Sequence, residues 1–261
     1  MHIDVLPSPY RPDPKIASLG AKIGDVVKAA DFPDTTLRYR NDRWAQTVGL
    51  DNLSDEEWVQ HFGRFIPLPD NMPEPLALRY HGHQFRVYNP EIGDGRGFLY
   101  AQLRDGHDRL LDLATKGSGT TPYSRRGDGR LTLKGGVREI MATEMLEALG
   151  VNTSKSFSLI ETGEELIRGD EPSPTRSAVL VRLSHSHIRI GTFQRMAAEG
   201  DADAMAQLVS YCLTILYNET PKDNPAAQLL YLAVERIADL AASYMVAGFV
   251  HGVLNTDNIN I

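Results

Sequence analysis

The sequence has little cysteine, no long apolar run and no excess of basic residues. Cys212 is the one cysteine, and it lies in the apolar run Tyr211–Tyr217, where a free thiol packs as a small hydrophobic side chain. A disulfide within one molecule is therefore excluded. No run of about 18 apolar residues occurs, and no basic start precedes an apolar stretch at the N-terminus, so we expect a cytoplasmic protein without a membrane span.

Acidic residues outnumber basic ones, and the formal net charge is −7. This balance disfavours general attraction to nucleic acid or anionic lipid, so we expect neither a nucleic-acid partner nor a membrane partner. Any binding of phosphate has to come from local clusters. With 261 residues, of which 42% are apolar, the chain is long enough to bury the core of one large domain or of two lobes. These numbers leave the oligomeric state open.

The first 75 residues are rich in proline and irregular in pattern. One helix is predicted over residues 54–62, because Ser54 and Glu57 form the pattern of a capping box. We interpret residues 1–75 as an N-terminal extension that wraps around the rest of the chain.

Residues 76–191 alternate short apolar runs with turn-forming residues. The pattern predicts a hairpin with strands at 98–103 and 109–115, whose turn contains Asp105 and Gly106. A glycine-rich polar stretch follows, and then a helix over 136–149 that stops at Gly150. Three more strands are predicted at 156–160, 165–168 and 178–183, the first two joined by a turn at Thr162 and Gly163.

Residues 192–261 are predicted to be helical. Apolar residues recur at three-and-four spacing over 202–217 and 226–250, and the last residues are polar and loop-like. The predicted fold class is therefore α+β, with a β-rich N-terminal lobe over residues 76–191 and the first part of a helical C-terminal lobe over residues 192–261. This order is typical of protein-kinase-like folds, although it is not specific to them.

A lysine and a glutamate follow a pattern known from protein kinases, which place a strand lysine on the nucleotide phosphates and hold it with a glutamate of the next helix. Lys116 ends a predicted strand, and Glu139 lies in the predicted helix that follows. The alternative is two unrelated surface charges. A functional pair is favoured because this helix could approach the sheet closely at its small residues, which are Gly135, Gly136, Ala142 and Thr143.

The C-terminal segment partly matches the kinase pattern H-R-D-L-x-x-x-N, in which the aspartate is a base and the asparagine binds a metal ion. His251 and Asn258 match the two ends of the pattern, but Val253 stands at the aspartate position. Because valine cannot accept a proton, Asp257 is the nearest carboxylate that could replace the base. Asn258 is the candidate metal ligand. A turn rich in asparagine, without a catalytic role, is the alternative.

Two clusters combine glycine with arginine and aspartate, at Gly93–Gly97 and Arg125–Arg130. Glycine lets backbone N–H groups approach phosphate oxygens, and arginine supplies forked donors. Neither cluster is a Walker loop or a G-x-G-x-x-G motif, and Asp-Gly turns are common in hairpins. Arg182 and Arg189 flank the run Ser-His-Ser-His and could add two guanidiniums at the seam between the lobes. Surface salt bridges are the alternative for both.

Two histidine pairs suggest a rival site. His81 and His83, and likewise His185 and His187, have the alternate spacing that puts two ligands on one face of a strand. Zinc needs three or four ligands, and the sequence places no third one. We therefore interpret His83 and His187 as residues that orient loops through hydrogen bonds.

Taken together, these motifs resemble the selenoprotein O family over nearly the whole chain. The strings that carry the resemblance are Arg79-Tyr-His-Gly-His-Gln-Phe85, Gly93-Asp-Gly-Arg96, Lys116-Gly-Ser-Gly-Thr-Thr-Pro-Tyr-Ser124, Gly127-Asp-Gly-Arg130, Arg138-Glu139, Ser186-His-Ile-Arg-Ile-Gly191 and His251-Gly-Val-Leu-Asn-Thr-Asp-Asn258. Proteins of that family are similar to pseudokinases but bind ATP in a flipped orientation. The resemblance thus implies a protein adenylyltransferase, which moves AMP from ATP to Ser, Thr or Tyr hydroxyl groups of protein substrates.

The resemblance also implies roles for single residues. Lys116 would contact the phosphates and pair with Glu139, and Asp257 would be the catalytic base. Asn258 would bind Mg²⁺ or Mn²⁺. The nucleotide would be lined by Gly93, Gly95, Arg96, Asp128 and Gly129, and its outer phosphates would be held by Arg182 and Arg189.

The sequence departs from the family pattern in three ways. Arg86 stands where glycine is usual after His-Gln-Phe, and His81 stands where alanine is usual before Gly82. The redox-associated cysteine or selenocysteine of the family is absent. The second metal ligand, an aspartate, would lie a few residues past Ile261, so we expect the 261-residue chain to be inactive or nearly so.

Two other functions remain open at this point. The chain could be a non-catalytic scaffold that binds ATP and a partner, or it could transfer UMP from UTP with manganese. The phosphate motifs do not choose between ATP and UTP, because base selection depends on the shape of the pocket.

Overall fold

Helix α2 (Asp55–Phe62) begins where the sequence predicts, because Ser54 caps it. The Ser54 side chain accepts a hydrogen bond from the Glu57 N–H at 3.2 Å, and the Glu57 side chain accepts one from the Ser54 N–H at 2.8 Å. The pair satisfies two donors that the start of a helix leaves free. In the computed structural model, which describes residues 6–261, Trp58 and Phe62 of this helix are buried and pack on Phe157.

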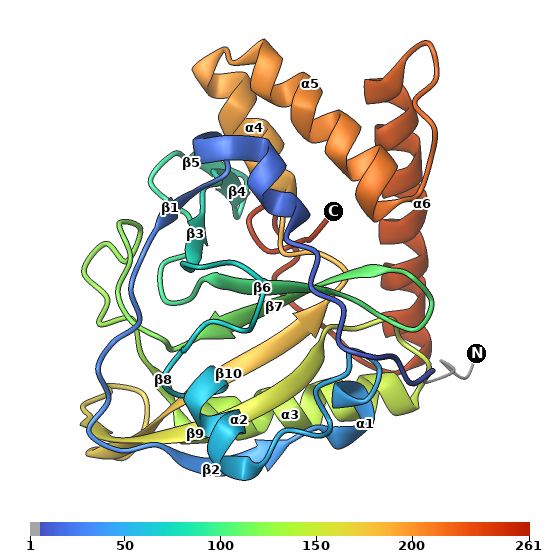
Figure 1. Ribbon diagram of the computed structural model, residues 1–261. Coiled ribbons are helices and arrows are strands. Elements are labelled where there is room, and N and C mark those ends of the chain that lie inside the picture. The colour runs from blue at the N-terminus through green and yellow to red at the C-terminus, as the bar shows by residue number, and fades with distance from the viewer. Residues whose placement is uncertain (1–5) are drawn as a thin grey trace.

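The strands of residues 6–261 form one eight-stranded sheet and one small hairpin (Figure 1). They are β1 (Gly24–Val26), β2 (Thr36–Arg40), β3 (Leu76–Leu78), β4 (Gly82–Gln84), β5 (Val87–Asn89), β6 (Leu99–Arg104), β7 (Leu110–Lys116), β8 (Leu131–Thr132), β9 (Lys155–Leu166) and β10 (Thr175–Ser184). The order in the sheet is β1-β3-β6-β7-β10-β9-β2, with β8 also paired to β10, and the pairs are antiparallel. β4 and β5 pair only with each other. The expected α+β class with a β-rich first part is confirmed.

Some helices lie against the sheet, and the helices that follow residue 190 extend beyond it (Figure 1). The further helices are the 3-10 helix η1 (Lys15–Lys22), α1 (Asp42–Ala45), α3 (Leu133–Ala148), α4 (Ile190–Glu199), α5 (Ala202–Tyr211), the π-helical turn η2 (Cys212–Leu216) and α6 (Pro225–Val246). α3 packs on β9 and β10, whereas α4, α5 and α6 pack mainly on one another and on η1 and η2. Within residues 6–261, the helices are too short or too polar to cross a membrane.

The two faces of the sheet carry separate cores, because successive side chains of a strand point to opposite faces. On β10, Val179 and Val181 point into the larger core, which the N-terminal segment covers with Trp44 and the aromatic residues of α2. The alternate residue Leu180 packs under α3. Residues of α3 and of the N-terminal segment therefore cover opposite faces of the same strands.

The N-terminal segment is more regular than its sequence predicts. Residues 24–26 and 36–40 form strands at the two edges of the sheet, so the expectation of an irregular segment is wrong at these places. These strands are short and lack clear alternation, and pairing with distant partners creates them, such as Leu37 with Ile160. The division at residues 75 and 191 stays a prediction.

The prediction of a turn at Thr162 and Gly163 that joins two strands is wrong, because residues 155–166 form one continuous strand, β9. Gly163 adopts a left-handed φ of 73°, and the register to β10 shifts between the pairs Glu161–Ala178 and Glu165–Arg176. Extra residues on one strand of a pair form a β-bulge, and glycine is common in bulges as well as in turns. The predicted strands at 156–160 and 165–168 are the two ends of β9.

The other predicted elements are found, with changes at their ends. The hairpin β6–β7 turns at residues 105–109, and the helix predicted over 136–149 is α3, which ends before Gly150 at a φ of 81°. The helix predicted over 202–217 is α5 up to Tyr211 and then the π-helical turn η2. The helix predicted over 226–250 is α6, which ends at Val246.

Candidate functional site

A cavity of about 1030 Å³ lies where β7, β10, α3, two glycine-rich loops and the segment after α6 meet. The residues that the sequence assigned to a nucleotide site all line it: Gly93, Gly95, Arg96, Lys116, Asp128, Gly129, Glu139, Arg182, Arg189, Asp257 and Asn258. The structure therefore brings together residues from distant parts of the chain. Their individual roles stay predictions.

Lys116 and Glu139 form an ion pair that joins the sheet to α3. Lys116 ends β7, and its neighbour across the sheet is Leu180, whose side chain lies on the face that α3 covers. Burial alone would raise the pKa of Glu139, but the charges of Lys116 and Arg182 outweigh it, so the pKa is lowered and the carboxylate stays ionised. The pair is therefore a charged pair inside the cavity wall.

Helix α3 reaches the sheet because a glycine faces it. A Cβ at Gly136 would lie 2.4 Å from Leu159 Cδ1, which is closer than carbon atoms can approach. Thr132 caps the helix by accepting a hydrogen bond from the Gly135 N–H at 3.0 Å. The close approach that the small residues predicted is confirmed at Gly136, and it brings Glu139 within reach of Lys116.

Two arginines on the inner wall carry unused donors. Arg182 lies opposite Ala114 in the register of β10 and β7, so it shares the sheet face of Lys116. Arg189 precedes α4, and its guanidinium lies 5.8 Å from the centre of the Tyr80 ring. Within residues 6–261, the buried Nε atoms of both arginines have no hydrogen-bond acceptor. Buried donors without partners are costly, so this wall suits an anionic ligand.

The two glycine-rich loops are joined to each other. Thr121 Oγ1 donates a hydrogen bond to the Asp94 carbonyl at 2.5 Å, and Ser124 Oγ donates one to the Gly95 carbonyl at 2.5 Å. The ring of Tyr123 lies over Gly93, where a Cβ would be 2.5 Å from Tyr123 Cγ. Glycine at this position therefore permits the loops to stack, and the cavity is lined by both together.

The second loop ends in a turn that needs glycine. Gly129 has a φ of 69°, and a Cβ there would lie 2.2 Å from the Gly119 carbonyl carbon. Asp128 accepts a hydrogen bond from the Arg130 N–H at 3.0 Å and pairs with Arg168 at 2.8 Å. Burial works to raise the pKa of Asp128, but the bond to Arg168 outweighs it and the pKa is lowered. The loop thus keeps an ionised carboxylate at the cavity.

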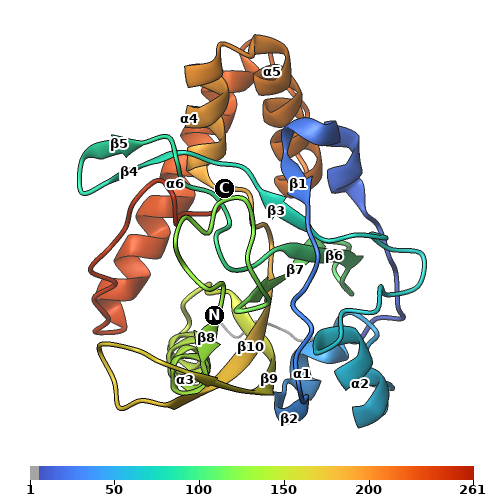
Figure 2. The ribbon, with the colours of Figure 1, turned by 90° about the vertical axis from the view of Figure 1, so that its left-hand side faces the viewer.

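Asp257 presents one free carboxylate oxygen. Its Oδ2 accepts a hydrogen bond from Gln84 Nε2 at 2.8 Å, whereas its buried Oδ1 has no partner among residues 6–261. The backbone of β4 approaches so closely that a Cβ at Gly82 would lie 2.8 Å from Asp257 Cβ. Thr256 adds a second link, because its Oγ1 accepts a hydrogen bond from the His83 N–H at 2.8 Å. Figure 2 shows the β4–β5 hairpin beside this C-terminal segment.

Asn258 closes the loop on itself. Its Oδ1 accepts a hydrogen bond from the Asn255 N–H at 2.9 Å, and its Nδ2 donates one to the Val253 carbonyl at 2.7 Å. The carboxamide oxygen keeps a second lone pair. This oxygen and Asp257 Oδ1 are metal-ligand atoms of the kind that Mg²⁺ and Mn²⁺ prefer.

The histidine pairs contact protein groups. His81 Nδ1 lies 2.6 Å from the Tyr88 hydroxyl, and His83 Nδ1 lies 2.9 Å from Gln194 Nε2. His187 is buried, and its Nδ1 lies 3.7 Å from Asp112 Oδ2, too far for a hydrogen bond. Within residues 6–261 neither ring nitrogen has a hydrogen-bond partner, so the expectation that this side chain orients a loop through hydrogen bonds is wrong. Burial lowers the pKa of His187 to about 4. Within residues 6–261, no three His, Cys, Asp or Glu side chains are grouped so that they could hold a metal ion.

The sequence missed Gln84 and Asp94 as residues of the site. Gln84 holds Asp257, and Asp94 Oδ2 accepts a hydrogen bond from the Leu78 N–H at 3.1 Å. Burial raises the pKa of the Asp94 carboxyl group, although the charges of Arg189 and Arg182 oppose the rise. Both residues stand inside strings that carried the family resemblance, and that position was the available signal.

Comparison with known proteins gives the family. A family model described as "Protein adenylyltransferase SelO" matches residues 9–261. A relative from Synechococcus elongatus is 53% identical over 256 residues, covering 97% of this chain and 51% of the relative, and one from Synechocystis is 51% identical over 255 residues, covering 95% and 53%. A relative from Ruegeria is 41% identical over 222 residues, covering 85% and 45%.

All three relatives are named "Protein nucleotidyltransferase YdiU". The chain spans about half the length of these relatives. The match over residues 9–261 and the identities near 50% show that the chain belongs to the SelO family.

Proposed function

We propose that the protein is a nucleotidyltransferase that moves AMP from ATP to Ser, Thr or Tyr hydroxyl groups of other proteins, in the cytoplasm. The cavity would hold ATP in the flipped orientation, so that the α-phosphate faces the acceptor. The names of the family model and of the relatives support nucleotidyl transfer. The choice of AMP, of these hydroxyl groups and of the flipped orientation is the finer part of the proposal.

The observation that carries the proposal is that the buried Nε atoms of Arg182 and Arg189 have no acceptor among residues 6–261, beside the Lys116–Glu139 ion pair. Transfer from the α-phosphate releases pyrophosphate, whose growing negative charge has to be stabilised as the bond breaks. Arg182 and Arg189 would bind the outer phosphates. Lys116 would contact the phosphates from β7, the neighbour of β10 in the sheet. Glu139 would keep the lysine charged and in place.

The remaining predicted residues would surround the nucleotide from the loop side. Gly93, Gly95 and Gly129 leave room for backbone N–H groups to approach it, and a side chain at any of these glycines would collide with the neighbouring loop. Arg96 and Asp128 line the same side of the cavity. The kinase-like arrangement, with a strand lysine and a helix glutamate, is part of this proposal.

Asp257 would accept the proton of the acceptor hydroxyl. One of its oxygens is held by Gln84, and the other is buried without a partner among the described residues 6–261, which is the state expected of a base that awaits a substrate proton. Val253 stands where ordinary kinases have their base. The reaction therefore relies on a carboxylate elsewhere in the loop.

Asn258 would hold a Mg²⁺ or Mn²⁺ ion together with phosphate oxygens and water. The free lone pair of its carboxamide oxygen fits this use. A bound divalent ion supplies charge stabilisation for the phosphates. Because residues 6–261 contain no group of three His, Cys, Asp or Glu ligands, the nucleotide itself would complete the coordination.

Incubation of the complete enzyme, at the length of the relatives, with α-labelled or γ-labelled ATP and a divalent ion tests the proposal. Covalent attachment of the α-label to protein is the expected result. Attachment of the γ-label would instead show an ordinary kinase, and attachment of neither label would favour a non-catalytic ATP-binding scaffold. The same assay with α-labelled UTP and manganese distinguishes UMP transfer.

A further inference from the structure

The apolar surface that holds helix α3 to the sheet is narrow. Gly136 and Leu146 are buried, and Leu133 and Ile140 are partly buried against the apolar cluster under the helix. Three apolar residues on other sides of the helix are exposed: Val137, Met141 and Met145. A helix that buries a full apolar stripe is fixed by that stripe. Because α3 lacks a wide buried stripe, its polar contacts decide much of its position.

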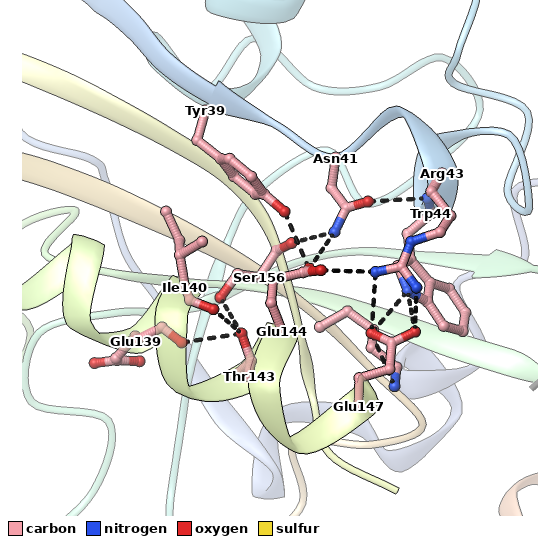
Figure 3. A network of polar contacts seen from close by, with 11 residues as sticks. Tyr39, Asn41, Arg43, Trp44, Glu139, Ile140, Thr143, Glu144, Glu147 and Ser156 are labelled. Carbon is pink, nitrogen blue, oxygen red and sulfur yellow. Dashed lines mark hydrogen bonds and ion pairs between the residues drawn. The ribbon is translucent and has the colours of Figure 1, made fainter. Parts of the chain in front are cut away.

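Those polar contacts come from the N-terminal segment and converge on Glu144 (Figure 3). The Glu144 carboxylate accepts hydrogen bonds from the Tyr39 hydroxyl at 3.1 Å and from Asn41 Nδ2 at 3.1 Å. Arg43 donates a third at 2.8 Å. One carboxylate of α3 is thus shared by three residues that precede the helix by about a hundred positions.

A second carboxylate, Glu147, lies one turn further along the same side of α3. Arg43 donates to it at 2.7 Å and the Trp44 indole donates at 3.0 Å, while Lys155 lies 3.4 Å away. The Glu147 side chain is only 8% exposed. A buried carboxylate has to be paired, so these contacts are specific to this docking of the helix.

The contacts continue towards Glu139. Thr143 Oγ1 donates to the Glu139 carbonyl at 2.9 Å and lies 2.8 Å from Ser156 Oγ, and Asn41 Nδ2 donates to the Ser156 carbonyl at 2.9 Å. Glu139 is about 7 Å along the axis from Glu144, since an α-helix rises 1.5 Å per residue. A shift or rotation of α3 at Glu144 therefore moves Glu139 relative to Lys116.

We infer that residues 39–44 act as a clamp that positions Glu139 on Lys116, with Arg43 as its central positioning residue. The clamp links the N-terminal segment to the phosphate end of the cavity, although none of its residues lines that cavity. When the clamp is loosened, α3 samples positions in which Glu139 does not reach Lys116. The consequence for ATP rests on the proposed function, whereas the consequence for the ion pair does not.

The test compares Arg43→Ala with Arg38→Ala, which is a matched control. Arg38 is 44% exposed and Arg43 is 43% exposed, but Arg38 pairs with Glu161 on β9 instead of with α3. The first measurement is the rate at which acetic anhydride labels Lys116, followed by mass spectrometry. We expect faster labelling in Arg43→Ala, because an amine released from its carboxylate is more often uncharged, and an unchanged rate in Arg38→Ala.

The second measurement is the dissociation constant of ATP relative to that of adenosine, by calorimetry on the 261-residue chain. Arg43→Ala should weaken ATP binding by about twofold to fivefold while adenosine binding is unaffected, the range expected for loss of an ion pair of this kind. The loss should vanish when Lys116→Ala is already present, because the clamp acts through Lys116. Arg43→Lys should restore part of the ATP affinity.

Each outcome decides the inference. Equal Lys116 labelling in Arg43→Ala and Arg38→Ala would overturn it, and so would a loss of ATP affinity that persists in the Lys116→Ala background. If the unaltered chain binds ATP no better than adenosine, the proposed function fails. The labelling experiment still decides the clamp in that case.

Discussion

Gln84 donates a hydrogen bond to Asp257 across 2.8 Å and thereby connects a two-stranded hairpin with the C-terminal loop of the site. Asn89 extends the contact, because its Nδ2 lies 3.4 Å from Gln84 Oε1. The amide group fixes one carboxylate oxygen and leaves the other without a hydrogen-bond partner among residues 6–261. The orientation of Asp257 therefore depends on β4 as well as on its own loop.

In the complete enzyme, replacement of Gln84 should reduce turnover more than nucleotide binding. In Gln84→Ala the carboxylate of Asp257 can rotate, so we expect a loss in kcat of about tenfold, a small part of the contribution of a general base. The dissociation constant of ATP should stay near its original value. Steady-state kinetics of α-label transfer and calorimetry measure the two quantities, and a loss confined to ATP affinity would assign Gln84 another role.

In the complete enzyme, Lys116→Ala should strongly reduce or abolish nucleotide transfer without unfolding the protein, because the lysine amino group lies on the cavity wall and its side chain contributes little to the core. Glu139→Gln should have a milder effect, since the lysine keeps a polar neighbour. Incorporation of α-label and the thermal unfolding midpoint are measured together. Unchanged transfer rates in both variants would show that the pair has no part in the reaction.

Arg182→Ala and Arg189→Ala should each weaken the binding of ATP much more than that of AMP or adenosine. Each charged hydrogen-bonding contact is worth roughly 1.5–3 kcal/mol. That free energy corresponds to about a tenfold to 150-fold change in the dissociation constant. Calorimetric titrations with the three ligands measure the difference, and equal losses for all three would place these arginines away from the outer phosphates.

Asp25 should make the free energy of unfolding sensitive to acid. The hydrogen bond from Arg79 at 2.9 Å is the main cause that lowers the pKa of Asp25, and the Tyr123 hydroxyl adds to it. A carboxyl whose pKa is lower in the folded state stabilises it above the unfolded pKa of about 3.9, and this contribution is lost as the pH falls through the folded pKa. Asp25→Asn should therefore be less stable than the original protein near pH 6.

The difference between Asp25→Asn and the original protein should shrink below about pH 4. Urea unfolding at pH 6 and at lower pH measures it. A constant difference over this range would mean that the carboxylate charge of Asp25 does not contribute.

Local patterns predicted much of the fold and the site. Ser54 and Glu57 set the start of α2 through atoms three residues apart, and Asp105 directs the β6–β7 turn by accepting hydrogen bonds from the His107 and Arg109 N–H groups. Such contacts depend on neighbours in the sequence, so the residue types reveal them. Lys116 and Glu139 were predicted because they match the kinase pattern of a strand lysine and a glutamate in the following helix, and because small residues let that helix approach the sheet.

Long-range pairing explains what the sequence did not reveal. β2 becomes a strand because it pairs with β9, and Gly163 forms a bulge instead of a turn because β10 continues beside both halves of β9. The contact of Gln84 with Asp257 joins residues 173 positions apart. A glutamine in a short polar run has no local feature that distinguishes it from a surface residue.

The position of β2 at the far edge of the sheet has a consequence for how the protein folds. Leu37 pairs with Ile160, so β2 leaves the ribosome long before its partner and has no neighbour in the sheet until β9 has been synthesised. Closing so long a loop costs entropy before the pairing returns any stability, and chains rich in such contacts fold slowly. We therefore expect the pairing of β2 with β9, and with it the contacts of residues 39–44 with α3, to form late in folding.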